Sequence, residues 1–341
     1  MKSSRIFSIR NKTNKAAFFA VLCALVVLSA VLSICFGAVF VAPGDILRAL
    51  LGQAAGSSQT QIILYARLPR TCGCLLAGMA LAVSGTVIQG VLNNPLAAPN
   101  IIGVSSGAGL AAALCGAIAP AAAAFTPVAA FLGALFGVML VLFIAEKTGA
   151  SKITLVLAGV AISGIFNAGI DAVVTFVPEA LNSYSDFRIG GVANLSMSRI
   201  IPALWGILVA FVLILSLAGE MDVLLLGAET AHSLGLRVRP LRLILLMLAA
   251  ALAGAAVSFS GLLGFVGLIV PHIMRRLVGS ESRTLILASA LGGAAMLTAC
   301  DLLARVLFAP YELPVGIVLA AVGGPFFLWL LFRQRGGRTH D

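Results

Sequence analysis

The chain of 341 residues has very little charge: only 10% of its residues are Asp, Glu, Lys or Arg, whereas 61% are hydrophobic. A soluble domain carries about 25% charged residues, so too few are present here to cover a water-exposed surface. The mean hydropathy of +1.12 points the same way. Composition therefore excludes a soluble globule and predicts an integral membrane protein.

The chain also lacks the motifs of common enzyme and metal sites. No lysine follows a glycine, which excludes the GxxxxGK[ST] phosphate loop and ATP hydrolysis by that route. The three histidines form no HExxH pair, and the six cysteines lack the spacing of metal ligands. We therefore expect no catalytic residues, no metal and no cofactor. Energy for any transport must come from an ion gradient or from another subunit.

What the chain has instead is a series of apolar runs, each near the length of about 20 residues that one helical crossing requires. The alternation over about ten residues that is typical of barrel strands is absent. We predict an all-α membrane protein with about ten spans. They are Ala16–Phe40, Thr71–Leu92, Ile101–Phe125, Pro127–Ala145, Ile153–Val177, Ile200–Leu217, Leu241–Ser260, Leu262–Val278, Thr284–Phe308 and Val315–Phe332. Glycines and Pro271 interrupt the sixth to eighth spans, whose bounds are the least defined.

The positions of the basic residues indicate the orientation. If both termini are cytoplasmic, sixteen of the 22 Lys and Arg residues lie on the inner side, as the preference of inner loops for positive charge predicts. The outer six are Arg48, Arg67, Arg70, Arg188, Arg199 and Arg305. Topology and anionic lipid then explain the net charge of +10 without any nucleic acid. We predict a cytoplasmic tail 1–15, one transmembrane domain 16–332 with an inner loop at about 219–240, and a cytoplasmic tail 333–341.

Residues 67–109 combine an apolar span with polar groups. Two arginines open the segment, Gln89 lies inside it, and a turn rich in Pro and Gly closes it. Polar side chains and helix breakers at bilayer depth are costly unless they face protein or a water-filled path, so the segment favours a translocation route. A polar kink satisfied by neighbouring helices, with no role in transport, is the alternative.

A faint inverted repeat relates the second span to the seventh. Ala77-Gly78 and Ser84-Gly85 match Ala253-Gly254 and Ser260-Gly261 at the same spacing, and a basic lead with a proline precedes both copies. The copies are five spans apart in the series, so they enter the membrane from opposite sides, as in transporters built from inverted halves. Gly and Ser are common in such helices, so chance is the competing explanation.

The inner segment Gly227–Leu236 is too polar to span the membrane. We expect a short helix that Gly235 caps. Its residues divide between one face with Ala231 and Leu234 and a solvated side with Glu229 and His232. Such a helix can serve as a binding site for a soluble partner; the alternative is a plain turn that only connects two spans.

Six segments together resemble one known family. They are Arg67–Arg70, Ala77–Gly90, Asn94–Pro99 with Gly103 and Gly107, Leu226–Leu236, Gly264–His272 and Glu312–Gly316. In this order they resemble the permease subunit of ATP-driven importers for vitamin B12, iron-siderophore complexes and haem. The resemblance runs from about Pro43 to Phe332.

The resemblance implies a vitamin B12 permease-like fold of ten spans in the inner membrane of a bacterium, paired with a second copy or a similar permease around a central pathway. Two cytoplasmic ATPase subunits and an extracytoplasmic substrate-binding protein would complete the importer. The family's ATPase-docking loop corresponds to Gly227, Glu229, His232, Leu234 and Gly235. The family's arginines that meet acidic residues of the binding protein correspond to Arg67, Arg70 and Arg305.

The resemblance also places residues along the pathway and at its inner gate. They are Ser84, Gln89, Asn93, Asn167, Asp171, Thr175, Thr148 and Ser151. Gln89 and Asn93 are four apart and are expected to share one helical face. For each of these side chains the alternative is a polar group satisfied by a neighbouring helix. The stretch Asn182–Ser198 departs from the family, because Phe187 stands where many relatives carry a tryptophan before a glycine pair, which leaves the shape of the outer mouth open.

Two other classes stay open at this point. A gradient-driven secondary transporter would use similar broken helices but usually needs a carboxylate near the bilayer centre, whereas Asp171 and Asp301 fall toward the outer ends of their spans. An intramembrane enzyme would need a convergent acid, base or metal set, which the sequence does not present. For the cargo, the resemblance favours an iron-siderophore complex, followed by haem and cobalamin.

Overall fold

A computed structural model describes residues 12–37, 39–52, 57–148, 152–309 and 311–335, and this part of the chain is all helix and connections without a strand. Seven of its helices are long and apolar enough to cross a membrane. They are α1 (Lys12–Cys35), α4 (Leu68–Leu92) with the turns before it, α6 (Thr126–Lys147), α7 (Lys152–Phe176), α9 (Met197–Ser216), α12 (Val238–Ser260) and α14 (Ser282–Val306). Shorter helices are α5 (Val104–Ile118), α13 (Val266–Val278) and the apolar part of α15 (Val315–Arg335). Each predicted span overlaps one of these helices, which confirms an α-helical membrane protein, while the number of crossings stays a prediction.

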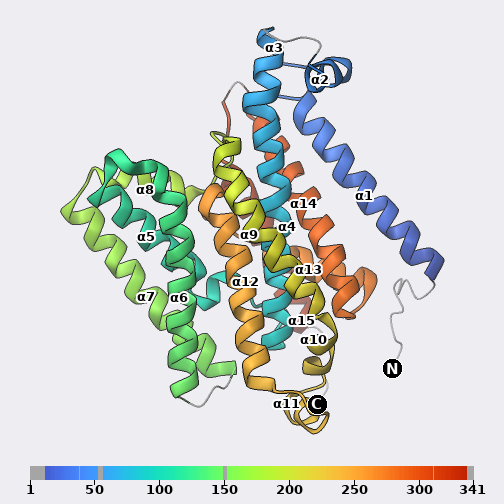
Figure 1. Cartoon of the computed structure of the whole chain (residues 1–341), viewed down its shortest axis with the longest axis vertical. Helices are drawn as coiled ribbons and strands as arrows, with labels where there is room; N and C mark the ends of the chain where they lie inside the picture. Colours follow the sequence, from blue (N-terminus) through green and yellow to red (C-terminus); the bar gives the residue numbers. More distant parts are fainter. Residues whose placement is uncertain (1–11, 38, 53–56, 149–151, 310, 336–341) are drawn as a thin grey trace.

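Helix α4 is the centre of the bundle, with α12, α13 and α14 packed around it (Figure 1). Nearly all of its side chains from Ala77 to Leu92 are buried. Small residues make this position possible: a Cβ added at Gly78 would overlap the Gly293 carbonyl in α14, and one added at Gly85 would overlap the Gly267 carbonyl in α13. The apolar core therefore forms by direct approach of main chains as well as by packing of side chains.

A second group of helices, α5 to α8 (Ala180–Ile189), lies beside this centre (Figure 1). Helices α5 and α6 pack together at Gly107 and Gly133, where a Cβ on either glycine would overlap the carbonyl of the other. Helix α12 contacts both α4 and α6 and so joins the two groups. Helix α1 lies at the opposite edge against α14, where Lys15 Nζ lies 2.8 Å from Glu281 Oε2 and lowers the pKa of that carboxyl group.

Two predicted spans are wrong in extent, because breaks shorten their helices. The third was expected over Ile101–Phe125, but α5 begins after the left-handed Gly103 (φ 85°) and gives way to a 3-10 turn, η3 (Pro120–Phe125). The eighth was expected from Leu262, but α13 begins at Val266 after left-handed backbone at Gly261 and Phe265. With 15 and 13 residues, α5 and α13 are about 20 Å long, short of the bilayer core of about 30 Å. The starts of both helices lie together beside the middle of α4.

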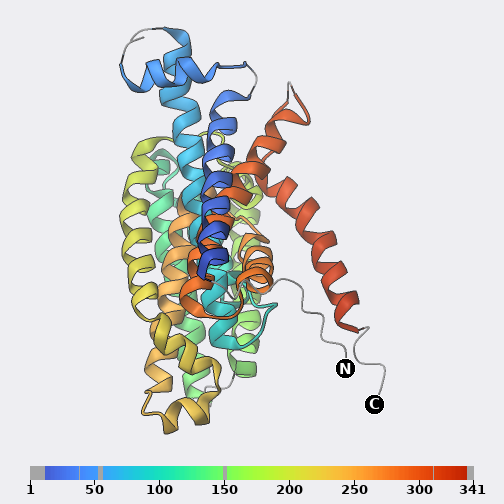
Figure 2. The ribbon, with the colours of Figure 1, turned by 90° about the vertical axis from the view of Figure 1, so that its right-hand side faces the viewer.

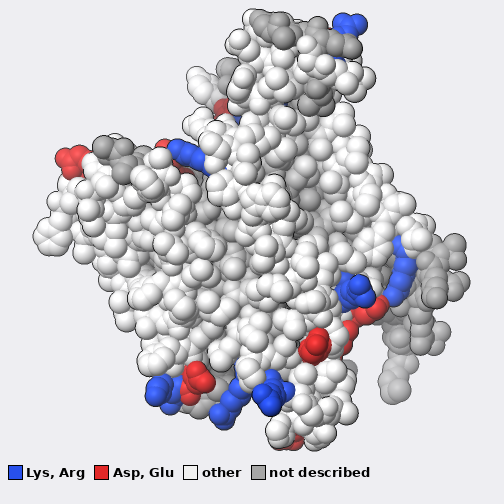
Figure 3. Space-filling model, in the orientation of Figure 1, with Lys and Arg blue, Asp and Glu red and all other residues white. Residues whose placement is uncertain are grey.

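Short elements occupy the two ends of the bundle. In the predicted orientation the outer end carries α2 (Pro43–Leu50), α3 (Ser58–Gln61), the π-helical turn η1 (Ile62–Arg67) and α8, and the inner end carries α10 (Ala218–Leu225) and α11 (Ala228–Ser233). The 3-10 turn η2 (Pro99–Ile102) precedes α5 and lies beside the middle of α4. Helix α1 starts and α15 ends toward the end with α11 (Figure 2). Charged side chains gather toward the ends and leave a broad uncharged band between them (Figure 3). This band has the character of a surface that faces the bilayer.

Replacing Gly78 with Ala is expected to destabilise the bundle, because the added methyl group overlaps main-chain atoms of Gly293, which cannot turn away as a side chain can. Overpacking of this kind costs about 1–3 kcal/mol and should lower the unfolding temperature of the purified protein in detergent. Gly164→Ala in α7 is the matched control, since a Cβ there meets no atom within 4 Å. An equal loss of stability in both variants would contradict the role given to the close contact of α4 and α14.

Candidate functional site

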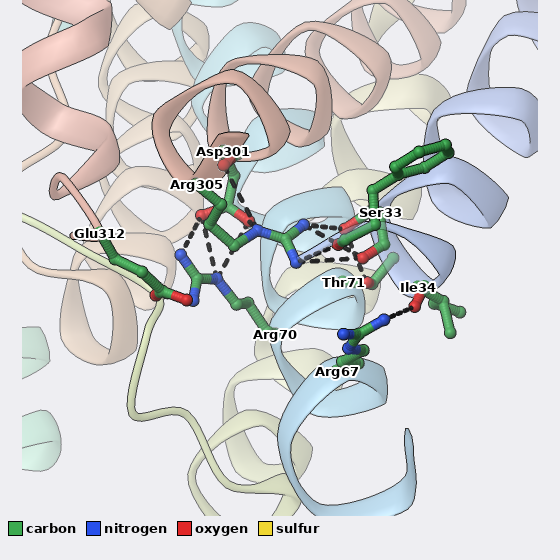
Figure 4. A network of polar contacts seen from close by, with 9 residues as sticks. Ser33, Ile34, Arg67, Arg70, Thr71, Asp301, Arg305 and Glu312 are labelled. Carbon is green, nitrogen blue, oxygen red and sulfur yellow. Dashed lines mark hydrogen bonds and ion pairs between the residues drawn. The ribbon is translucent and has the colours of Figure 1, made fainter. Parts of the chain in front are cut away.

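The three arginines predicted to contact a binding protein converge at the outer end of α4 and α14 (Figure 4). We call Arg67, Arg70 and Arg305 the outer arginine cluster. Their exposed fractions are 7%, 8% and 5%, so all three are buried. Burial of three cations is costly unless each finds acceptors within the protein. Their partners therefore decide what the cluster can do.

Arg70 is held by two carboxylates of different exposure. Its Nε lies 3.1 and 3.0 Å from the two carboxylate oxygens of Asp301, and its Nη2 lies 3.0 Å from Asp301 Oδ1. Its Nη1 donates to Glu312 Oε2 at 2.6 Å. The side chain of Asp301 is fully buried, whereas that of Glu312 is 42% exposed. Arg70 therefore has one internal partner and one partner at the edge of the solvent.

The other two arginines bind the end of α1. Arg305 donates to the Ser33 carbonyl at 3.1 Å and to the Phe36 carbonyl at 3.0 Å, and also to the Ser33 hydroxyl at 2.8 Å. Arg67 donates to the carbonyls of Ile34 at 2.6 Å and Cys35 at 2.9 Å, and to that of Val39. The last carbonyls of a helix lack partners in the helix, and cations stabilise that end. These two arginines thus cap α1.

Asp301 completes the cluster by contacting a second arginine. Its Oδ2 lies 3.2 Å from Arg305 Nε, one helical turn further along α14. The Ser33 hydroxyl shares a hydrogen bond of 2.9 Å with that of Thr71, which adds another link between α1 and α4. The outer arginine cluster therefore ties α1, α4, α14 and the connection to α15 together. Its contact with a binding protein stays a prediction, and such a contact would require present partners to give way.

A cavity of about 490 Å³, which we call the outer cavity, opens next to Arg70. It lies between α8, the end of α12 and the start of α15, and both Glu312 and Asp186 contribute to its wall. Arg199 at the start of α9 adds a second cation. The volume falls within the range of about 300–1,000 Å³ that is common for small-molecule sites. The outer end thus has a hollow whose wall carries charges of both signs.

The stretch that departs from the family's pattern forms a main-chain junction beside this cavity. The Leu262 amide donates to the Phe187 carbonyl and the Gly191 amide to the Ser260 carbonyl, both at 2.9 Å. Gly190 is left-handed (φ 71°), and a Cβ on it would overlap the Leu262 carbonyl. The junction uses the carbonyl of Phe187, which any residue supplies, and Phe187 is also one of the residues that line the cavity. A different side chain at position 187 would therefore change the cavity wall and leave the junction in place.

Two residues predicted to line the pathway are buried within this chain. The Ser84 hydroxyl is fully buried and donates to the Ala249 carbonyl of α12 at 2.7 Å. Gln89 is 2% exposed; its Nε2 lies 3.4 Å from the carbonyls of Gly267 and Leu268, and its Oε1 accepts from Arg275 Nη1 at 3.0 Å. Both side chains join α4 to its neighbours in this conformation and face no open path. Their role in the pathway stays a prediction.

The expectation that Gln89 and Asn93 share one helical face is wrong. Helix α4 ends at Leu92, and Asn93 adopts a left-handed conformation (φ 49°) with its side chain exposed. Thr148, expected at the inner gate, follows the last residue of α6 and donates its hydroxyl to the Ile144 carbonyl at 2.7 Å. Ser151 lies outside the described residues, as do 1–11 and 336–341 of the two predicted tails.

Helix α7 presents the predicted pathway residues on an exposed face. Asn167, Asp171 and Thr175 follow one another at intervals of four residues, and all three are exposed in the single chain. The Thr175 hydroxyl donates to the Asp171 carbonyl at 2.7 Å. Polar side chains on a membrane helix usually face protein or water and not lipid. This face therefore suits contact with another subunit or with an aqueous path.

The inner loop contains the expected short helix, α11. Gly227 precedes it and Gly235 follows it, both left-handed (φ 109° and 82°), and the Gly235 amide donates to the His232 carbonyl at 2.9 Å. Ala231 is buried, and Glu229 and His232 are exposed, as predicted. Leu234 differs from the expectation: it lies past the end of the helix and is 64% exposed instead of sharing the buried face of Ala231. The inner end therefore presents an apolar side chain beside polar ones.

Comparison with known proteins gives a consistent result. The model of the FecCD transport family matches residues 25–333. The hemin transport system permease protein HmuU of Yersinia pestis is 40% identical over 300 residues, covering 86% of this chain and 89% of that protein. The Fe(3+)-citrate import system permease protein YfmE of Bacillus subtilis is 37% identical over 313 residues, covering 91% and 93%. A solved structure described as a metal-chelate type ABC transporter in an inward-facing conformation has a TM-score of 0.81 at 30% identity, covering 93% of this chain and 99% of that one.

Replacing Asp301 with Asn should destabilise the protein strongly, because Arg70 and Arg305 would keep their charge while their shared carboxylate is lost. Removing one partner of a buried ion pair costs about 3–5 kcal/mol. Glu312→Gln is the matched control: it removes a carboxylate from the same Arg70, but at an exposed position where a pair contributes about 1 kcal/mol or less. Unfolding in detergent measures both. If Asp301→Asn is no more harmful than Glu312→Gln, Asp301 does not hold the cluster together.

Proposed function

The chain belongs to the FecCD transport family, and from this membership we propose that it is the membrane permease through which an iron chelate enters the cell. It is a permease subunit of an ATP-binding-cassette importer, as its relatives over nearly the whole chain are. The relatives are named for hemin, ferric citrate and siderophores, so we propose a ferric siderophore as the cargo, with haem and then cobalamin as the next candidates. Carriage of cobalamin rests on the sequence resemblance alone.

The match to permeases of ATP-driven importers is the observation that carries this function. A secondary transporter finds no such support, and the buried carboxylate of Asp301 is held by two arginines, so it is not available to couple an ion. Because the chain has no phosphate-binding loop, a separate subunit must hydrolyse the ATP. We propose two such subunits and an extracytoplasmic binding protein, with both termini of the permease in the cytoplasm of a bacterial cell.

Ten crossings arranged as an inverted repeat are the proposed architecture. Support comes from equivalent contacts of the two copies: Gly78 of α4 packs against Gly293 of α14, and Gly254 of α12 packs against Ala134 of α6. The short helix α5 follows the first copy, α4, and the short helix α13 follows the second copy, α12. Both short helices begin beside the middle of α4. The second half of the repeat is less alike, since Gly85 lies within α4 whereas Gly261 follows the end of α12.

A pair of permeases is proposed to enclose the pathway with α7. The support is the exposed polar face of Asn167, Asp171 and Thr175, which a lone chain would turn toward lipid at considerable cost. A second copy, or a similar permease, on this face would convert the polar stripe into one wall of an aqueous route. Ser84 and Gln89 would reach this route only if α4 separates from α12 and α13.

The inner loop is proposed to dock the ATPase. It projects beyond the ends of the long helices (Figure 1), and its side chains Glu229, His232 and Leu234 are exposed. An exposed leucine gains most from burial in a groove, while the glycines at 227 and 235 fix the bends on either side. Movement of the ATPase subunits would thus pass to α10 and α12, which flank the loop.

At the outer end, docking of the binding protein is proposed to involve Arg70 by exchange of carboxylates. Asp301 anchors the guanidinium from inside, whereas the exposed Glu312 occupies the side nearest the outer cavity. A carboxylate of the binding protein would compete with Glu312 for this position. Release of Glu312 would free the connection that leads into α15, and so link docking to the helices of the pathway.

Glu312→Gln should therefore strengthen docking, because it removes the internal competitor for Arg70. An exposed pair contributes about 0.2–1 kcal/mol, so a gain of about 1.4- to 5-fold in affinity is expected when the permease in nanodiscs is titrated with its binding protein. Asp186→Asn is the matched control, since it also removes one negative charge from the wall of the outer cavity. An equal gain in both variants would point to general charge repulsion instead of release of Arg70.

Uptake into proteoliposomes tests the function itself. With the ATPase subunits, the binding protein and ATP present, a ferric siderophore labelled with radioactive iron should accumulate, and haem and cobalamin are the comparison cargoes. Leu234→Ser should lower the affinity for the ATPase, and uptake at limiting ATPase, by about tenfold, because an exposed apolar contact is lost. Leu51→Ser, a leucine of similar exposure (62%) at the outer end, should retain uptake. Gradient-driven uptake by the chain alone would contradict the proposal.

A further inference from the structure

A second set of basic residues lies at the inner end, away from the outer arginine cluster. Arg239 and Arg242 are three residues apart in the first turns of α12 and border a small cavity of about 30 Å³. The rest of its wall is mostly apolar. It consists of Leu142, Ala145 and Glu146 from α6, Leu155 from α7, and Leu243 from α12. The cavity therefore lies where three helices, including the one that joins the two helix groups, come together.

The surroundings of this cavity are strongly basic. Lys147 ends α6 and Arg237 precedes α12, so with Arg239 and Arg242 they form what we call the inner basic rim. Glu146 is the acid in the cavity wall. Within the described part of the chain, Arg239 and Lys147 have no carboxylate within the 4.0 Å of an ion pair. Figure 3 shows basic side chains grouped at this lower edge, beneath α6 and α12. Arg239 and Lys147 can therefore accept an anion from outside the chain.

The apolar neighbours of the rim indicate which kind of anion fits. Next to the cavity residues along the helices, Phe143 is 59% exposed, Leu157 63% and Ile244 49%. These helices belong to the membrane-spanning set, so such side chains face acyl chains. The Lys147 ammonium lies 5.9 Å from the centre of the Phe143 ring, at the boundary between charge and apolar surface. A soluble partner would meet the charges but leave the apolar side chains uncovered, whereas a lipid covers both.

We propose that the inner basic rim binds an anionic phospholipid of the cytoplasmic leaflet. The phosphate group lies between Arg239 and Arg242 within reach of Lys147, and one acyl chain lies across the opening of the small apolar cavity between α6, α7 and α12. Basic pockets between helices at the cytoplasmic surface bind anionic lipid headgroups by this combination of charge and apolar contact. Since α12 follows directly after α11 and packs against α6, the bound lipid would steady the inner loop against the second group of helices.

Native mass spectrometry of the purified chain, titrated with dioleoyl phosphatidylglycerol or dioleoyl phosphatidylcholine, tests this site. The wild type should retain the anionic lipid preferentially. Arg239→Gln with Arg242→Gln should weaken that binding by about tenfold or more, since each basic residue at a membrane surface contributes appreciably to attraction of anionic lipid. Arg276→Gln with Arg283→Gln is the matched control, because both arginines are exposed inner-end residues outside the inner basic rim and the cavity wall, and the same charge is removed.

Further variants separate a lipid from a free anion and from misfolding. Arg239→Lys with Arg242→Lys should keep the binding, and Leu243→Trp, which fills the cavity without changing charge, should reduce it. Inorganic phosphate in excess should not displace the lipid if the acyl chain contributes. Equal retention in the double glutamine variant and the wild type overturns the proposal, as does equal loss in the control or full displacement by phosphate. If the glutamine variant does not fold, unchanged binding by Leu243→Trp overturns it.

Discussion

The outer half of this permease depends on one buried carboxylate. Asp301 holds Arg70 from α4 and Arg305 from α14, and through Arg305 it reaches the carbonyls at the end of α1. Without that negative charge, Arg305 would be buried with only dipoles to stabilise it, and Arg70 would keep only the half-exposed carboxylate of Glu312. The same residue thus permits charge inside the membrane domain and fixes the positions of three helices that sequence separates widely.

Helix α4 extends this constraint through the molecule. At its outer end Arg70 contacts the acidic partners, at its middle glycines contact the main chains of α13 and α14, and near its inner end Gln89 contacts Arg275 of α13. The side chains of Ser84 and Gln89 both have partners in the chain, which is how polar groups can lie on the helix at the centre of an apolar bundle. Opening a route along α4 requires exchange of these contacts, as in an alternating mechanism driven by other subunits.

Much of the fold follows from composition and spacing, because apolar runs of span length and glycines at loop ends act locally. The helices α6, α7, α9 and α14 lie within a few residues of their predicted bounds, and α11 ends at Ser233, two residues before the expected capping residue Gly235. Contacts between residues far apart in the sequence could not be predicted from composition and spacing. Asp301 is 231 positions from Arg70, and no local sequence pattern indicates that the two residues form an ion pair. The distribution of charge predicted that Arg67, Arg70 and Arg305 lie at the outer side, but it could not show that their side chains are buried within the protein. Likewise, hydropathy could not show that left-handed residues cut α5 and α13 short.

In the junction beside the outer cavity, the contacts that hold the backbone in place are separate from the side chains that line the cavity. Its links run between amides and carbonyls of Phe187, Gly191, Ser260 and Leu262, so they use no side chain, although Gly190 and Gly261 must stay glycine because a Cβ at either position would overlap the junction. The mouth of the importer can then acquire a different lining while its frame remains the same. In this architecture, side chains of the cavity wall can be substituted to suit a new chelate or a new binding protein, while the main-chain contacts that hold α8, α12 and α15 in place stay unchanged.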